Sequence, residues 1–285
     1  MTMKYPLLLC LMLTLSADIC AQTSKNVCYR VAPGEVKYAP AEKKTTVGNV
    51  LGSLAETMLT GKTTSQLPEY TDAVVTSVLS GLDNARRLTI VEVAPDAPSR
   101  DYIVNGSISN ISTTSKIEAP AKKWEQGNEY FKALVTVTLN LSNATSGERS
   151  DSHTFSVSDS DLGWMGSRER AIDGALRALS SKVTSYYNAL FPLYATIIER
   201  GDIDKDKQKT VYIDLGTAIG ATEGMQFDVF TVKTIAGREA RTEIGRLKIS
   251  KVMGDDISLC KVNKGDKQIK TALDNNETLL VISRK

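Results

Sequence analysis

The stretch KALVTVTLNLSNATSGERSDSHTFSV, residues 132–157, decides the fold class of this 285-residue chain. Apolar residues alternate with polar ones over residues 132–141, which is typical of a strand with one buried face. The segment Asn143–Gly147 then supplies turn residues, and His153–Val157 resumes the alternation. The stretch therefore predicts a β-hairpin.

Helical periodicity flanks this hairpin on both sides. Residues 167–190 and residues 68–86 each carry apolar side chains at helical spacing. Strands are predicted at 88–93 and 102–111, and a helix weakened by glycines is predicted at 45–59. The order helix, helix, strands, helix predicts a sheet covered by helices.

The pattern of charged, apolar and glycine residues changes in the last third of the sequence. Residues 199–209 are almost wholly charged, which predicts a linker. Short apolar runs punctuated by glycines follow and are typical of a small barrel or sandwich. We predict an α+β protein, with a helix-covered sheet over 45–198, a charged linker over 199–209 and a small all-β barrel-like domain over 210–285.

The first 21 residues have the layout of a secretory signal peptide. Lys4 precedes a short apolar run at residues 7–13, and Ala21 places a small residue before Gln22. We predict cleavage near Ala21/Gln22, which leaves an extended lead-in over residues 22–44. The expected location is periplasmic or outer-membrane-associated.

The apolar run at the N-terminus is too short to span a bilayer, and no longer one follows. We therefore expect no membrane-spanning helix after cleavage. A lipid anchor stays an alternative, although neither Cys10 nor Cys20 follows the small residue that lipidation needs. A buried core segment is the other alternative.

Signal cleavage would leave Cys28 and Cys260 as the remaining cysteines. In an oxidising compartment this pair is compatible with a disulfide between the two ends of the mature chain. It is equally compatible with two unrelated thiols, because the sequence does not give the distance between their Cα atoms.

Charge and composition give no basis for nucleic-acid binding or for a cofactor. The formal net charge is +2, and the basic residues are scattered rather than clustered. The single histidine, His153, lies in a predicted strand without a nucleophile motif. We predict no enzyme activity, no catalytic residue, no metal and no cofactor. An envelope hydrolase that uses the acids Asp159, Asp161 and Glu169 is the alternative.

Two tryptophans are candidate contact residues for a partner. Trp164 and Met165 form an apolar tip between two glycines, and Trp124 follows two lysines. Tryptophan is enriched among the residues that anchor interfaces. We hypothesise that Trp164 and Met165, and then Trp124, contact a partner; in the alternative, Trp164 folds back as a lid on the core.

The order of these elements resembles the family of the curli-secretion lipoprotein CsgG. Residues 71–93 (TDAVVTSVLSGLDNARRLTIVEV) and 101–108 (DYIVNGSI) precede 133–141 (ALVTVTLNL), a Ser-Asn-Ala-Thr-Ser-Gly turn and the helix 171–187. The resemblance covers roughly residues 45–193. That family shares its fold with lipoprotein activators of penicillin-binding proteins and with the N-terminal domain of TolB.

The C-terminal part is similar to the small β-domain of the flagellar assembly protein T, which follows a CsgG-like domain. Residues 211–229 (VYIDLGTAIGATEGMQFDV) and 243–262 (EIGRLKISKVMGDDISLCKV) carry that likeness. The cut at Ala21/Gln22 also resembles those of Bacteroidetes envelope proteins.

The resemblance implies a non-enzymatic cell-envelope protein that acts as an assembly, scaffold or activator module. The implied partner is an envelope protein or peptidoglycan-associated machinery. The resemblance also implies that the chain can form a homo-oligomer. An outer-membrane secretion-channel component of the curli type is the alternative. Residues 112–128 are charged and interrupted by Pro120, so they lack the alternation that a membrane-crossing hairpin needs.

Overall fold

The computed structural model describes residues 26–40, 62–92, 99–120, 127–158 and 160–284. Within these residues the chain forms two compact units. The sheet unit comprises residues 29–188, and the barrel unit comprises residues 26–28 and 189–284. The predicted signal peptide, the whole of the predicted helix at 45–59 and Trp124 lie outside the described residues.

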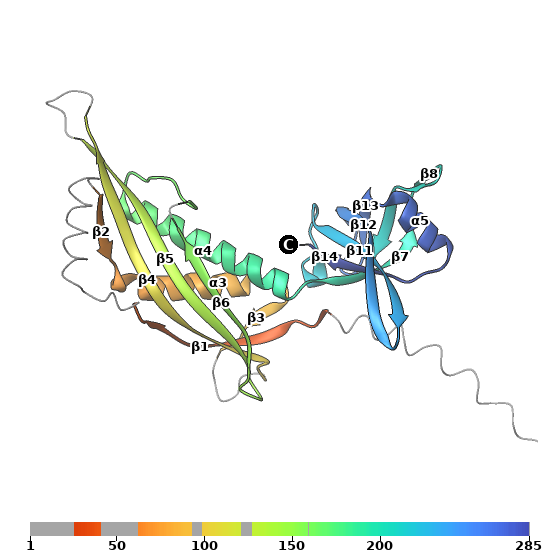
Figure 1. Ribbon diagram of the computed structural model, residues 1–285, viewed down its shortest axis with the longest axis horizontal. Coiled ribbons are helices and arrows are strands. Elements are labelled where there is room, and N and C mark those ends of the chain that lie inside the picture. Colours follow the sequence, from red (N-terminus) through yellow and green to blue (C-terminus); the bar gives the residue numbers. More distant parts are fainter. Residues whose placement is uncertain (1–25, 41–61, 93–98, 121–126, 159, 285) are drawn as a thin grey trace, which may run out of the picture. The chain divides into compact units, whose positions relative to one another are not determined.

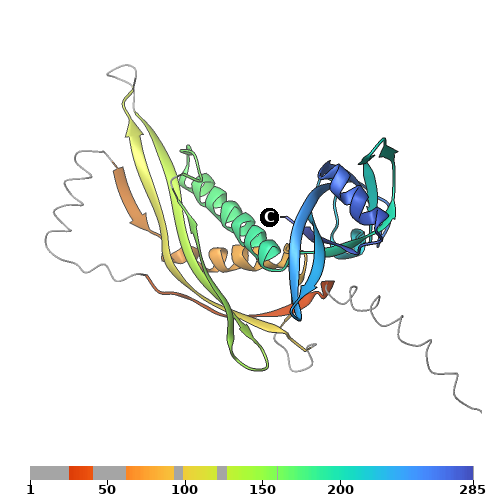
Figure 2. The same ribbon diagram turned by 45° about the vertical axis from the view of Figure 1, so that its right-hand side comes forward.

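The sheet unit is a six-stranded mixed sheet whose path runs β3-β1-β4-β5-β6, with β2 paired to β4. β1 runs parallel to β3 and β4, and the other pairs are antiparallel. The strands are β1 (Tyr29–Tyr38), β2 (Lys62–Gln66), β3 (Leu88–Ile90), β4 (Tyr102–Glu118), β5 (Asn128–Asn143) and β6 (Arg149–Val157). A 3-10 turn, η2 (Pro68–Tyr70), leads into α3 (Thr71–Asp83), and α4 (Arg168–Leu190) follows β6. Both helices lie on one face of the sheet (Figures 1 and 2).

The core of the sheet unit lies between this face and the helices. Alternate residues of β5 are buried there: Ala133, Val135, Val137, Leu139 and Leu141. Helix α4 contributes a buried stripe that includes Leu179, Val183 and Tyr187. Gly81 of α3 packs closely on α4, because a Cβ at this position would lie 2.7 Å from the Ser180 carbonyl oxygen. The apolar residues that recur about every 2 positions in the strand and about every 3.6 positions in the helix thus form the buried faces of these elements.

The opposite face of the sheet, here called the open face, carries polar side chains that pair across the strands. Thr138 and Thr154 are 2.9 Å apart, and the hydroxyl of Ser152 donates to Asn140 at 2.8 Å. Thr136 pairs with Ser156 in the same way. Such cross-strand pairs stabilise the sheet without needing a covering layer.

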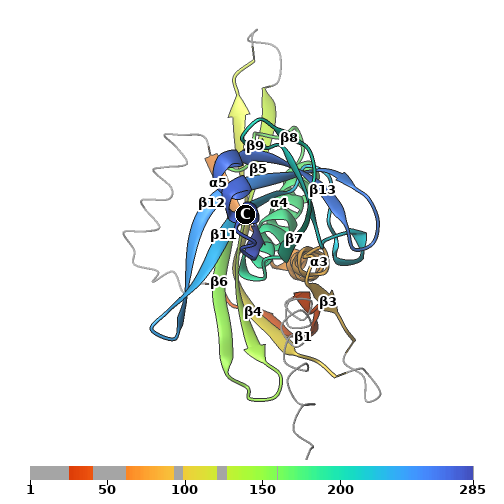
Figure 3. The same cartoon turned by 90° about the vertical axis from the view of Figure 1, so that its right-hand side faces the viewer.

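The barrel unit is a closed barrel with the strand order β10-β13-β12-β11-β14-β7. Its strands are β7 (Tyr194–Arg200), β10 (Thr210–Ile213), β11 (Gln226–Ile235), β12 (Arg238–Val252), β13 (Ser258–Lys264) and β14 (Leu279–Ser283). The turn η3 (Thr217–Ile219) precedes β11, and α5 (Asp266–Asp274) lies against β12 (Figure 3). Inward side chains such as Phe227, Leu247 and Val281 fill the core. This architecture agrees with the predicted α+β class and barrel-like C-terminal domain.

Strands β11 and β12 continue past the barrel as a two-stranded arm, residues 232–243. β11 pairs with β14 only as far as Thr231, and β12 pairs with β13 from Arg246 onward. Ala236 and Gly237 turn the arm with φ values of 51° and 77°.

The element boundaries differ from the predicted ones around residue 200. β7 belongs to the barrel, and a small hairpin of β8 (Ile203–Asp204) and β9 (Lys207–Gln208) occupies the predicted linker 199–209. The charged side chains of this hairpin project into solvent, and the segment therefore has the composition that is typical of a linker. Gln208 is nevertheless fully buried and donates to the Thr210 carbonyl at 2.7 Å.

Three further segments differ from the prediction. The lead-in contains β1, which pairs inside the sheet unit. Helix α5 interrupts the domain predicted as all-β. Strands β4 and β5 continue into the segment 112–128 and pair as far as Glu118 with Asn128. Charged residues there lie on the solvent side of regular strands, and this obscures the period in the sequence. Within the described residues, no helix is both long enough and apolar enough to cross a bilayer.

Candidate functional site

The loop before α4 is fixed to the start of β5 by Met165. The Phe131 amide donates to the Met165 carbonyl at 2.8 Å, and the Met165 amide donates to the Phe131 carbonyl at 2.9 Å. Directly paired residues point to the same side of a sheet, so Met165 faces the helices with Phe131. A Cβ on Gly174 of α4 would lie 3.7 Å from Met165 Cε. Met165 therefore packs against α4.

Trp164 precedes Met165 and points to the open face. Its ring centroid lies 4.9 Å from Lys116 Nζ and 5.1 Å from Lys132 Nζ, and Lys116 is also 5.6 Å from the Tyr130 ring. We call Lys116, Tyr130, Lys132 and Trp164 the Trp164 cluster. Cation–π attraction holds the half-buried indole in place. Trp164 thus lies on the open face and not over the apolar core.

Asp161, the acid of the hydrolase alternative, forms a clamp with Lys182. Asp161 Oδ1 is 2.8 Å from Lys182 Nζ, and Oδ2 accepts the Ser158 amide at 2.7 Å. These bonds, above all the one from Lys182, lower the pKa of Asp161 to about 2. A general acid needs a raised pKa, so the shift at Asp161 is opposite to the one that the acid of a hydrolase needs. Glu169 is exposed in the first turn of α4, and Asp159 lies outside the described residues.

The Asp161 clamp predicts a small pH effect of definite sign. Because the folded-state pKa lies below the ordinary value of 3.8, the contribution to stability is complete above that value and is lost as the pH falls toward 2. We expect Asp161→Asn to lower the urea midpoint slightly at pH 7 and to match the wild type near pH 2. The exposed Asp173 on α4 supplies the control, Asp173→Asn, which should show no such convergence. A deficit that persists at pH 2 would contradict the clamp.

His153 is part of an aromatic stack beside β6. Its ring lies 3.9 Å from that of Tyr186, centroid to centroid, at 21°. The Tyr186 hydroxyl donates to Asp151 Oδ1 at 2.8 Å. Burial, followed by this bond and the Asp151 charge, raises the pKa of Tyr186 to about 12. The stack borders an open groove of about 550 Å³, here called the β6 groove, whose other lining residues include Ser181, Lys182 and Ser185.

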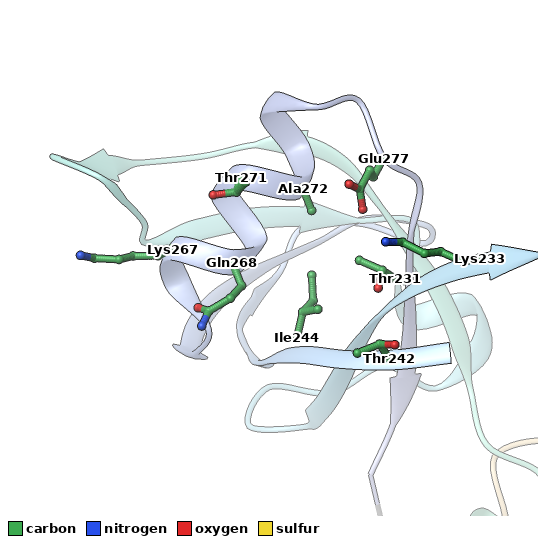
Figure 4. A pocket seen from close by; sticks show the side chains of 9 residues that line it. All are labelled: Thr231, Lys233, Thr242, Ile244, Lys267, Gln268, Thr271, Ala272 and Glu277. Atoms are coloured by element: carbon green, nitrogen blue, oxygen red, sulfur yellow. The ribbon is translucent and has the colours of Figure 1, made fainter. Parts of the chain in front are cut away.

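A second open groove lies in the barrel unit between the arm and α5 (Figure 4). It measures about 520 Å³, and Ile244 and Ala272 supply its apolar surface. Thr231, Thr242 and Thr271 add hydroxyl groups, whereas Lys267 points away from the other lining side chains (Figure 4). The polar groups are spread along the groove and do not converge on one point.

No disulfide joins Cys28 to Cys260, both of which are described residues. Cys260 lies on β13 with its side chain in the barrel core and is fully buried, whereas Cys28 is exposed. Of the two alternatives that the sequence left open, the structure has separate thiols. Burial raises the pKa of Cys260 to about 12.

The buried position of Cys260 predicts slow thiol chemistry. At pH 8 the thiol stays protonated, and the thiolate is the reactive form. In a Cys28→Ser background we expect a thiol reagent to leave Cys260 unmodified in the native protein and to modify it fully in denaturant. Mass spectrometry of the labelled peptide measures this, with Cys28 in the wild type as the fast-reacting control. Rapid native labelling of Cys260 would show that the barrel core is open.

No protein-family model and no curated protein matches this chain. Among solved structures, it is similar to a PelC dodecamer from Paraburkholderia phytofirmans, with 14% identity, 56% of this chain and 87% of that chain covered, and a TM-score of 0.30. A DUF330 protein from Xanthomonas campestris matches with 11% identity and a TM-score of 0.31, and the match covers 57% of this chain and 83% of that chain. A neuraminyllactose-binding hemagglutinin homolog from Helicobacter pylori matches with 11% identity and a TM-score of 0.27, and the match covers 56% of this chain and 83% of that chain. Likenesses this low assign neither a family nor an activity.

Sequence reasoning selected Trp164 and Met165 but missed the residues around them. Lys116, Tyr130 and Lys132 join the cluster only through the pairing of β4 with β5, in which Lys116 lies opposite Tyr130 and Thr114 opposite Lys132. Had the strands been extended to 118 and 128, alternation would have placed these side chains on one face.

Proposed function

We propose that this chain is an exported, non-enzymatic cell-envelope protein that docks an envelope partner protein through the Trp164 cluster. The observation that carries this is the position of Trp164, half-exposed on the open face between two lysines. The motifs that resemble the CsgG family, and the signal-peptide pattern, support an assembly or scaffold role. The partner is an envelope protein or part of the peptidoglycan-associated machinery.

The cluster has the properties of an interface anchor. Its indole is already ordered, because Met165 is hydrogen-bonded to Phe131 and the two ammonium groups lie near the ring. An ordered aromatic side chain loses little conformational entropy on binding. Lys116 is also paired with Glu118 at 2.8 Å, which fixes its side chain beside the ring. The indole offers apolar area, and the lysines form a charged rim around it.

We expect Trp164→Ala to weaken partner binding without unfolding the protein. Loss of an aromatic anchor costs on the order of 2 kcal/mol, which corresponds to roughly a 30-fold higher Kd. The partner is first identified by crosslinking in intact cells, and its affinity for purified wild-type and variant protein is then measured by calorimetry. The melting temperature should stay close to that of the wild type, because the indole lies outside the core.

Ile117→Ala is the matched control, because Ile117 is an exposed apolar residue of the same hairpin with 69% of its surface accessible. It should bind the partner as the wild type does. Equal affinity of the Trp164→Ala variant, or a large fall in its melting temperature, would contradict the proposed role. Export is checked separately: protein from the envelope fraction should begin at Gln22, and an intact N-terminus in the cytosol would refute it.

A further inference from the structure

The barrel has an outer surface over β12 and β13 whose side chains reach the solvent. Val252 pairs with Ser258 and Ile249 pairs with Cys260, and the side chains of Ser258 and Cys260 are fully buried inside the barrel. Because successive residues of a strand point to opposite faces, their neighbours point outward. We call this outward set the β13 wall: Lys248, Lys251, Met253, Ile257, Leu259 and Lys261.

The middle of the β13 wall is apolar. Leu259 lies opposite Lys251 of β12 and Tyr212 of β10. Met253 and Ile257 continue the pairing, since the Met253 amide donates to the Ile257 carbonyl at 3.0 Å. Met253 has 53% of its surface accessible, and Ile257, Leu259 and Tyr212 are half-buried. An exposed apolar strip with polar margins is typical of an interaction surface.

The two ends of this apolar strip carry opposite charges. At one end, Lys248 and Lys261 lie directly opposite each other and are exposed. At the other end, the exposed Asp255 and Asp256 lie in the turn that joins β12 to β13. Lys261 comes three residues after Ser258, and Asp255 comes three residues before it. The β13 wall thus has a cationic end and an acidic end at equal sequence separations from Ser258.

The cationic end lacks the compensation that the next pair along the same strands has. Like charges directly opposite each other destabilise a sheet. Arg246 and Lys264 also face each other, but a Glu243 carboxylate oxygen lies 3.3 Å from Arg246 Nε and 4.0 Å from Lys264 Nζ. Lys248 and Lys261 form no ion pair with any residue that the structure describes. Carboxylates of another molecule would remove their repulsion, and both ammonium groups are accessible to it.

We infer that two copies of this chain pack with their β13 walls face to face, around a two-fold axis that lies in the interface and crosses β13 at Ser258. This axis turns the cationic end of each copy onto the acidic end of the other, so that Lys261 meets Asp255. In the middle, Leu259 meets Ile257, and the two apolar strips cover each other. A two-fold axis makes each of these contacts twice.

Charge complementarity selects a second copy as the occupant of the wall. One surface supplies both the unpaired lysines and the aspartates, and its own two-fold image matches them, whereas a purely acidic partner would repel Asp255 and Asp256. The register follows from the same matching. With the axis at Leu259, Lys261 would meet Ile257 and the lysines would keep their repulsion. This self-association involves the barrel unit and is independent of the docking proposed for the Trp164 cluster.

The association is tested by sedimentation velocity of the purified full chain over a wide range of concentration. We expect a monomer–dimer equilibrium for the wild type. Lys248→Glu with Lys261→Glu makes both ends of the wall acidic, and Asp255→Lys with Asp256→Lys makes both ends basic. Each of these two variants alone should have a dimer Kd raised about tenfold or more, because like charges then face each other. An equimolar mixture of the two should form a heterodimer, because the opposite charges meet again.

The matched control is Lys233→Glu with Lys267→Glu, which makes the same change in net charge at exposed lysines of the barrel unit outside the wall. It should dimerise as the wild type does.

Carbodiimide coupling tests the register and does not depend on any variant folding. The reagent joins a lysine amine to a carboxylate as an amide, with loss of water and no spacer. In a mixture of isotopically light and heavy wild-type protein, mass spectrometry should find Lys261 joined to Asp255 between a light and a heavy chain. A wild type that is monomeric throughout, a control that dissociates, a mixture of the two charge variants that stays monomeric, or the absence of this crosslink would each overturn the inference.

Discussion

Leu139→Ala should lower the free energy of unfolding of the sheet unit by about 2–5 kcal/mol. Leu139 is fully buried on β5, opposite the helices. Its truncation removes apolar contacts and leaves a cavity that the neighbouring strands and helices cannot fill. The chain has two tryptophans, Trp124 and Trp164, and both belong to residues 29–188. Urea unfolding followed by tryptophan fluorescence therefore reports on this unit.

The matched control for Leu139 lies on the same strand. Leu134→Ala makes the same chemical change at a half-buried residue of β5 that points to the open face. We expect it to cost far less, because little apolar surface is removed from a packed environment. Equal losses for the two variants would mean that the open face is covered, which contradicts the assignment of faces.

Gly265→Ala should lower the stability of the barrel unit by roughly 2–5 kcal/mol. Gly265 has a φ of +76°, a conformation that costs a residue with a Cβ about 1–2 kcal/mol. A Cβ there would also overlap the Ile244 carbonyl oxygen and lie 2.7 Å from Gly245 Cα, and such overpacking typically adds about 1–3 kcal/mol. Both neighbours are backbone atoms, so they cannot turn aside.

Gly237→Ala separates the two contributions. Gly237 has nearly the same φ, +77°, but no atom lies within 4 Å of a Cβ built on it. The free energy of unfolding of Gly237→Ala should be lower than that of the wild type by about 1–2 kcal/mol, which is the cost of the backbone conformation alone. The labelling rate of Cys260 in increasing urea measures the stability of the barrel unit. A Gly265→Ala protein as stable as Gly237→Ala would show that the contact with Ile244 can relax.

The elements that follow from local periodicity were predictable, and those that depend on long-range pairing were not. The alternation at 132–141 and the stripe at 167–190 identify β5 and α4, because each element buries one face. The prediction of a linker at 199–209 was wrong, because a short exposed hairpin has the same charged composition as a linker. Helix α5 is short and lies among strand-like runs, so its period was not recognised.

The candidate site was predictable only in part, for the same reason. Trp164 is conspicuous because it is a tryptophan between glycines, and the sequence suffices to select it. Its lysine neighbours lie 48 and 32 positions earlier in the chain, so only the fold brings them to the indole. The same holds for Tyr186, whose partner Asp151 lies across a helix–strand contact. The family resemblance and the envelope function stay predictions.

The position of β14 has a consequence for the timing of folding. β14 follows all the other described strands along the chain, yet it lies between β7 and β11 and pairs with both. While a ribosome still holds residues 279–283, the sheet unit is already fully emerged, but the barrel has a gap along its whole wall. Domains form as their residues become available, and contacts between distant residues form slowly. A nascent chain therefore exposes the unpaired edges of β7 and β11 until β14 has left the ribosome, and unpaired strand edges are sites of aggregation.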